Sequence, residues 1–211
     1  MRNRVRQGAL LVPVLLAAGY AGAQPKPAAP AAAPAAPAAA KPGAPAAAPP
    51  ATSLAAPPKP AAELDQMKIF LGKWKCDGKA FASPMSPTEH GLKATAEGKM
   101  EVDNFWQSFT YEEKKSKEHP GLKVHGFWGF DQGAKRFVRA AVGNHGEWDT
   151  ASSPGWEGDN LIWTGELSGP MGRIAFHHRF TKKGDKEWVH FLEIRTPDGK
   201  WIPAEEVTCK K

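Results

Sequence analysis

The sequence predicts an all-β domain, built as a closed antiparallel up-and-down barrel of about ten strands with one short N-terminal helix. Apolar and polar residues alternate with period two through most of residues 72–209, as in strands with one buried and one solvated face. Turn-forming clusters interrupt this alternation at the spacing of hairpins. No long helical segment is present to connect parallel strands, so an α/β fold is excluded.

A helix is expected before the first strand, because Leu64, Met67 and Phe70 recur at helical spacing within residues 63–71. Strands are then expected at residues 72–80, 92–102, 104–114, 122–131, 135–142, 146–152, 160–167, 172–181, 186–196 and 200–209. Clusters of Gly, Pro, Asn and Asp, such as residues 197–199, mark the turns between them. This succession of hairpins favours an antiparallel barrel or sandwich.

The only two cysteines favour a closed barrel. Cys76 lies on the first expected strand and Cys209 on the last. These strands are neighbours in a closed up-and-down barrel, whereas they lie at opposite edges of an open sheet. We therefore predict a Cys76–Cys209 disulfide that joins the barrel seam; two free thiols are the alternative.

Three segments are expected: a signal peptide at residues 1–23, a disordered Ala/Pro-rich linker at residues 24–62 and the barrel domain at residues 63–211. Three arginines, an apolar stretch at residues 9–18 and small residues up to Ala23 follow the order of a secretory signal peptide. We expect cleavage after Ala23, which makes the protein periplasmic or secreted. The apolar stretch is shorter than the about 20 residues of a transmembrane helix. An uncleaved anchor is thus the weaker alternative, and no transmembrane segment is expected in the mature chain.

The expected domain carries no formal net charge. Six of the 28 basic residues and none of the 22 acidic residues precede Glu63, so the net charge of +6 belongs to the leader and linker. Because nucleic-acid-binding domains are usually basic, we expect no nucleic-acid partner. We also expect a monomer. The linker has the composition of an extended spacer, and a proline-motif ligand for a partner protein is the alternative.

Several short segments of the expected domain occur in the order typical of a known family. They are LGKW at residues 71–74, GFWGFD at 126–131, KRFV at 135–138, GEWD at 146–149, LIWTGE at 161–166, DGK at 198–200 and EEVTCK at 205–210. The first resembles the Gly-x-Trp of lipocalin-like (calycin) barrels. Together they resemble a bacterial domain-of-unknown-function family with a lipocalin-like β-barrel, over nearly all of residues 63–211. The resemblance implies a barrel that binds a molecule inside or at its mouth; the family has no established activity, so no functional residue is implied.

A histidine pair is expected on the inner wall of the barrel. If the strands on either side of Gly184 form a hairpin centred on it, His178 faces His190. Phe176 and Trp188 share the inner faces of these strands, because side chains alternate along a strand. The pair is therefore expected to be a polar point in an otherwise apolar wall.

Three roles are open for this pair. In the first, the two rings are interior polar groups that form hydrogen bonds with each other, with Tyr111 or with water. In the second, they orient a ligand in an apolar pocket. In the third, they bind a metal or haem. A metal site would lack a third ligand in register, because His177 points to the opposite face. We therefore predict no metal site and no cofactor.

Arg139 shares a strand face with Phe137 and Ala141, where it is a candidate to bind the carboxylate head group of a lipid-like ligand. An outward, solvated arginine is the alternative. Tryptophans are more often core than ligand platform, and Trp128 is expected inside the barrel. The ligand-binding residues predicted from the sequence are thus His178, His190, Trp128, Trp188, Phe176 and Arg139.

The sequence leaves open whether the barrel is hollow or filled. Abundant Trp and Phe favour a filled core, while small residues expected to point inward favour a cavity: Gly72, Gly78, Ala80, Ala94, Ala96, Gly98 and Gly126. Motifs such as the nucleophile elbow and His-Glu-x-x-His are absent, so no catalytic residue is predicted. We expect an exported barrel that binds a small apolar or amphipathic ligand. The alternatives are a structural or envelope-interaction module with a filled barrel, and a haem-binding, metal-binding or enzymatic barrel that uses His178 and His190.

Overall fold

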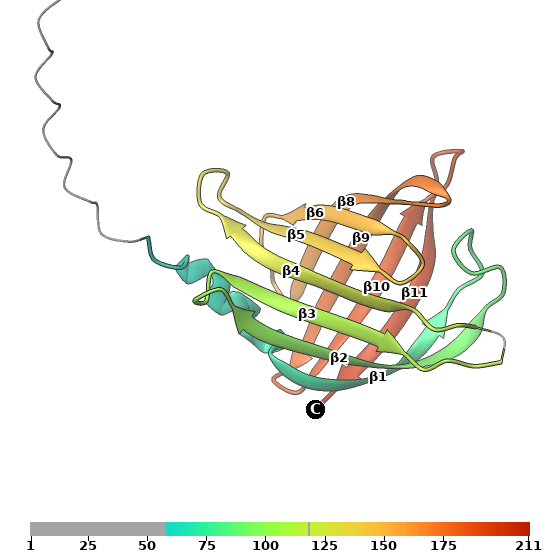
Figure 1. Ribbon diagram of the computed structural model, residues 1–211, viewed down its shortest axis with the longest axis horizontal. Helices are drawn as coiled ribbons and strands as arrows, with labels where there is room; N and C mark the ends of the chain where they lie inside the picture. Colours follow the sequence, from blue (N-terminus) through green and yellow to red (C-terminus); the bar gives the residue numbers. More distant parts are fainter. Residues whose placement is uncertain (1–57, 118) are drawn as a thin grey trace, which may run out of the picture. The chain divides into compact units, whose positions relative to one another are not determined.

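The computed structural model describes residues 58–117 and 119–211 (Figure 1). The predicted signal peptide and residues 24–57 of the predicted linker lie outside the described residues. Within the described ranges, no helix combines the length and the apolar character needed to cross a membrane.

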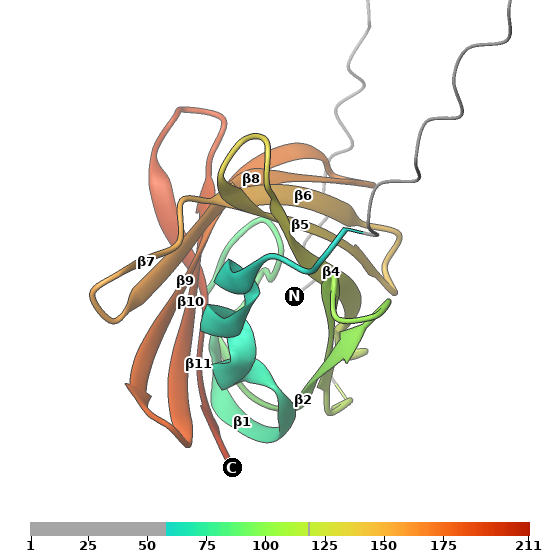
Figure 2. The ribbon, with the colours of Figure 1, turned by 90° about the vertical axis from the view of Figure 1, so that its left-hand side faces the viewer.

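Eleven strands within the described residues join into one antiparallel sheet that closes on itself (Figures 1 and 2). The elements are η1 (Ala62–Phe70), β1 (Gly72–Ala80), β2 (His90–Glu101), β3 (Trp106–Glu113), β4 (Lys123–Asp131), β5 (Arg136–Gly143), β6 (Trp148–Ser153), β7 (Trp156–Glu157), β8 (Asn160–Gly169), β9 (Gly172–Gly184), β10 (Glu187–Arg195) and β11 (Trp201–Lys210). Strand β6 pairs with β8, and β1 pairs with β11, so β1–β6 and β8–β11 form a closed ring. This ten-stranded barrel with one short helix confirms the predicted fold class. The two-residue β7, which was not predicted, pairs with the start of β8.

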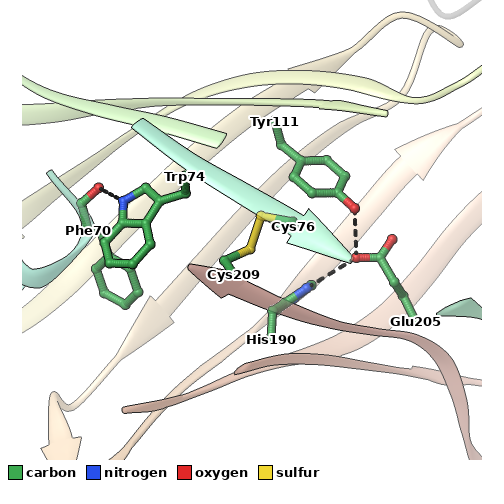
Figure 3. Close-up of a disulfide and its surroundings, with 7 residues drawn as sticks. All are labelled: Phe70, Trp74, Cys76, Tyr111, His190, Glu205 and Cys209. Carbon is green, nitrogen blue, oxygen red and sulfur yellow. Dashed lines mark hydrogen bonds and ion pairs between the residues drawn. A yellow bond between two sulfur atoms is a disulfide. The ribbon is translucent and has the colours of Figure 1, made fainter. Parts of the chain in front are cut away.

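A disulfide joins the seam between the first and last strands (Figure 3). Cys76 of β1 lies directly opposite Cys209 of β11, with 4.1 Å between their Cα atoms. Both side chains are buried in the barrel core. The predicted Cys76–Cys209 bond is confirmed, because barrel closure makes the first and last strands neighbours.

Helix η1 lies across one end of the barrel (Figure 2). It is a 3₁₀ helix, and its buried residues are Leu64, Met67 and Phe70. The ring of Phe70 packs edge-to-face against those of Trp128 and Trp188, at centroid distances of 4.9 and 5.6 Å. The indole of Trp74 donates a hydrogen bond of 3.0 Å to the backbone oxygen of Phe70 (Figure 3). Aromatic side chains therefore close this end, and we call it the filled half: η1 with Trp74, Trp128, Trp163, Phe180 and Trp188.

Two inward glycines make room for neighbouring protein atoms. A Cβ atom at Gly98 would lie 2.5 Å from the backbone oxygen of Phe70, and one at Gly126 would lie 2.5 Å from the ring of Phe109. Both distances are far below van der Waals contact, so only glycine lets these neighbours approach the strand. Small inward residues at these positions thus serve the packing of η1 and Phe109, and they were poor markers of a cavity.

Tryptophans lie on both faces of the barrel wall. Those buried inside are Trp74, Trp128, Trp163 and Trp188. Trp106, Trp148 and Trp201 are exposed instead, and Trp148 retains 49% of its accessible surface. The expectation that tryptophans belong to the core is wrong for Trp106 and Trp148. The alternation along each strand, and not the type of side chain, decides which face a residue occupies.

Candidate functional site

The half of the barrel away from η1 is hollow. A cavity of about 690 Å³ opens there among the loops that follow β1, β3 and β5, three strands that run away from η1. Much of its wall is apolar and includes Ala80, Ala141, Ile174, Phe176, Ile194 and Ala204. We call this part of the barrel the hollow half. Its volume lies in the range of about 300–1,000 Å³ that is usual for small-molecule sites.

A small set of residues separates the hollow half from the filled half. A second cavity, of about 100 Å³, lies on the filled side next to Phe70 and Trp188. The residues that border both cavities are Leu122, Val124, Arg139, His178, Leu192 and Glu205. We call these six residues the waist. Half of them are polar, so the waist places polar groups at the base of a mainly apolar cavity.

His178 and His190 both lie on the inner face, as predicted, and their rings are in contact. Nδ1 of His178 is 2.6 Å from Nε2 of His190. The predicted register is wrong by two residues, because His190 lies opposite Phe180 instead of His178. The chain turns after Gly184 instead of at it, and the strand pairing is irregular at the start of β10. A shift of two residues keeps every side chain on its face, so the two rings meet as diagonal neighbours.

A hydrogen-bond chain runs from Tyr111 through Glu205 and His190 to His178; Figure 3 shows its first three members. Oε1 of Glu205 accepts from the Tyr111 hydroxyl over 3.4 Å and from Nδ1 of His190 over 3.3 Å. A carboxylate only accepts hydrogen bonds, so Nδ1 of His190 carries a proton and donates to Glu205. In a neutral His190 ring, Nε2 is then the acceptor of the bond to His178. His178 then donates from Nδ1, which leaves its own Nε2 as an unprotonated acceptor. The chain fixes the tautomer of both rings.

Burial keeps both ends of this chain uncharged at neutral pH. Burial lowers the pKa of His178 well below its usual value, and the positive charge of Arg139 acts in the same direction. Burial raises the pKa of Tyr111 well above its usual value, and the carboxylate of Glu205 acts in the same direction. His178 is therefore a neutral imidazole and Tyr111 a neutral phenol.

Arg139 points into the barrel, and its charge is already matched. Its Nε and Nη2 donate to the two carboxylate oxygens of Asp149 over 2.8 and 2.9 Å, and both side chains are buried. Its guanidinium also lies 4.9 Å from the ring centroid of Phe109. The outward alternative for Arg139 is wrong. The carboxylate that it binds in this structure belongs to the neighbouring strand β6.

All six residues predicted for the ligand site face the barrel interior, at different depths. Trp128, Trp188 and His190 border the small inner cavity, Phe176 borders the hollow half, and Arg139 and His178 belong to the waist. Within the part of the chain that the structure describes, no group of three or more His, Cys, Asp or Glu side chains is arranged to hold a metal ion.

Two acidic residues of the site were not predicted. Asp149 directly follows Trp148, whose large apolar side chain suggested the opposite facing. Glu205 directly precedes the exposed Glu206. Counting back in steps of two from Cys209 would have placed Glu205 on the inner face.

Comparisons with known proteins give a family and a fold. Residues 59–211 match the model of a family described as "Protein of unknown function (DUF1579)". The chain is similar to the crystal structure of Rv2717c from M. tuberculosis, with a TM-score of 0.56 and 11% identity, over 72% of this chain and 99% of that chain. At this low sequence identity, the similarity shows the fold alone. A redesigned β-barrel is also similar, with a TM-score of 0.36 and 9% identity, over 68% of this chain and 92% of that one. No curated protein matches the chain.

Proposed function

We propose that this chain, which belongs to the DUF1579 family of proteins of unknown function, is an exported barrel that binds a small apolar or amphipathic molecule in its hollow half. The apolar part of the molecule occupies the cavity, and its polar group meets the waist.

One observation carries the proposal: the same barrel encloses a packed core at one end and a cavity of about 690 Å³ at the other. Protein interiors are close-packed, and a barrel that served only as a structural module would be filled along its whole length. Ligand sites, by contrast, are mainly apolar cavities with a few placed polar groups. The hollow half with the waist at its base has this composition.

Two features support export. Disulfides persist in oxidising compartments, and the Cys76–Cys209 bond is buried in the barrel core. Residues 1–23 have the order of charge, apolar stretch and small residues that is typical of a signal peptide. N-terminal sequencing of the protein from the cell envelope is expected to begin at Gln24, and an intact leader would contradict export.

A pair of adjacent alanines on β5 provides the test of ligand binding. Ala141 is buried and lines the hollow half, whereas Ala140 points outward and is exposed. The indole of Ala141→Trp would occupy the cavity, and that of Ala140→Trp would lie in solvent. With the apolar fluorescent probe N-phenyl-1-naphthylamine, we expect Ala141→Trp to weaken binding by about tenfold or more and Ala140→Trp to leave it unchanged.

Failure of the unmodified protein to bind the probe, or equal binding by both variants, would overturn the proposal and favour a structural module. Native mass spectrometry of the full chain from the periplasm gives an independent reading, because a bound molecule adds mass that denaturation removes. A visible absorption band in the same sample would instead favour the haem alternative that uses His178 and His190.

A further inference from the structure

We infer that the waist selects ligands whose polar group is an uncharged hydrogen-bond donor, such as the hydroxyl of a long-chain alcohol. A ligand with the same alkyl chain and a carboxylate as its polar group binds less tightly. This inference rests on the proposed function and names the class of head group that the cavity takes. It stands on the direction of the hydrogen bonds at the waist and on the balance of charge there.

The hydrogen bonds leave one acceptor available at the waist. Starting from the carboxylate of Glu205, each bond of the chain is directional and ends on Nε2 of His178. That nitrogen has no hydrogen-bond partner within the described residues, and His178 borders both cavities. A ligand hydroxyl that donates to Nε2 completes the chain. A carboxylate has no proton to donate and would place its lone pairs against that of Nε2.

The balance of charge at the waist also disfavours an anion. The guanidinium of Arg139 is matched by a two-point bond to Asp149, which is the strongest pairing that an arginine makes with a carboxylate. Glu205 is buried and brings a carboxylate to the edge of both cavities. A ligand carboxylate would therefore meet a like charge, and no lysine or second arginine among the described residues borders either cavity to offset it. It would also lose its hydration in the apolar cavity.

Histidines on opposite faces of β9 provide a matched pair of variants. His178→Phe removes the free acceptor and keeps a ring of similar size. His177→Phe changes the neighbouring residue, whose ring stacks on the exposed Trp201 at a centroid distance of 3.8 Å. Decan-1-ol and decanoate then compete with the fluorescent probe at about pH 8, where decanoate is ionised. The measured quantity is the ratio of the affinities for decan-1-ol and decanoate, because any change that affects both ligands equally cancels in this ratio.

We expect His178→Phe to reduce the preference for the alcohol by about tenfold and His177→Phe to leave it unchanged. Glu205→Gln provides a second variant and removes the like charge, so it is expected to tighten decanoate binding by about tenfold. An unchanged ratio in both His178→Phe and Glu205→Gln, or tighter binding of decanoate by the unmodified protein, would overturn the choice of head group and leave the cavity as a ligand site. Failure of the probe and of both decyl compounds to bind would overturn the proposed function itself.

Discussion

The filled half and the hollow half are built by the same ten strands, and on β5 and β10 the inward side chains change in kind along the strand. On β5 the inward residues run from Phe137 through Arg139 to Ala141, and on β10 they run from Trp188 through His190 to Leu192. Both of these strands thus pass from an aromatic to a polar and then to a smaller apolar side chain. The size and polarity of the inward side chains therefore change on these two strands at the level where the core ends and the cavity begins.

Helix η1 sharpens this difference between the two halves. Phe70 brings a ring into the filled half from outside the sheet, and Gly98 lets its backbone come close to β2. The open end lacks an equivalent helix within the described residues. The filled half therefore gains its density from a second layer of structure, while the hollow half has only the barrel wall. We expect substitutions in the filled half to affect mainly stability and substitutions in the hollow half to affect mainly binding.

The largest effect is expected from the disulfide, which lies at the level of Trp188 in the filled half. The bond closes a loop with a sequence separation of 133 residues. Loop-closure entropy predicts that the double variant Cys76→Ala, Cys209→Ala loses about 5 kcal/mol of unfolding free energy, as measured by urea unfolding. Under conditions where the variant is still folded, its affinity for the fluorescent probe is expected to be unchanged. A loss below about 1 kcal/mol would show that strand pairing alone secures the seam.

Two leucines on β8 test the difference in packing directly. Leu161 is fully buried in the core, whereas Leu167 is half-buried and lines the hollow half. Leu161→Ala leaves a cavity in close-packed surroundings and is expected to cost about 3 kcal/mol, while Leu167→Ala widens an existing cavity and is expected to cost about 1 kcal/mol. Equal losses in urea unfolding would mean that the two halves are packed alike, and the comparison would fail.

Features that depend on alternation or on ring closure could be predicted from the sequence. Alternation along the strands placed His178 and His190 on the inner face although the predicted register was wrong. A shift of two residues leaves every side chain on the same face of the sheet. Ring closure predicted the Cys76–Cys209 bond, because it depends only on which strands come first and last. These two rules were enough for the fold class and for the inward facing of His178 and His190.

Features that depend on contacts between distant segments could not be predicted. A glycine is required at position 98 because the backbone of Phe70 comes close to the strand there. The alternation of apolar and polar residues gives no indication of that contact. Arg139 was predicted to bind the carboxylate of a ligand, but in the structure it binds Asp149. Asp149 follows the exposed Trp148, and nothing in the sequence indicated that its side chain points inward. The division into a core and a cavity depends in part on a contact of the same kind, since Phe70 of η1 adds its ring to the filled half.

The smallest effect is expected from pH, and it acts at the boundary between the two halves. The pKa of His178 is lowered in the folded protein, mainly by burial, while an unfolded histidine titrates near its ordinary value of 6.5. Below about pH 6.5 the unfolded chain therefore binds more protons than the folded one, and unfolding becomes easier as the pH falls. This contribution to stability is complete above the unfolded pKa and is lost toward the lowered folded pKa. A single histidine of this kind contributes a loss of about 1 kcal/mol between about pH 7.5 and about pH 5.5.

The variant pair on β9 isolates this contribution. Glu113, whose pKa is raised mainly by burial, acts in the opposite sense: it adds stability in acid that is lost as the pH rises above about 4.5. That contribution is common to all variants and cancels when the pH dependences of their unfolding free energies are compared. His178→Phe is expected to lose about 1 kcal/mol less than the unmodified protein on acidification, whereas His177→Phe keeps the full loss. Parallel curves for all three proteins would mean that His178 is as free to take a proton in the folded barrel as in the unfolded chain. The waist would then be a solvated opening between the two cavities and no longer a dry boundary between core and ligand site.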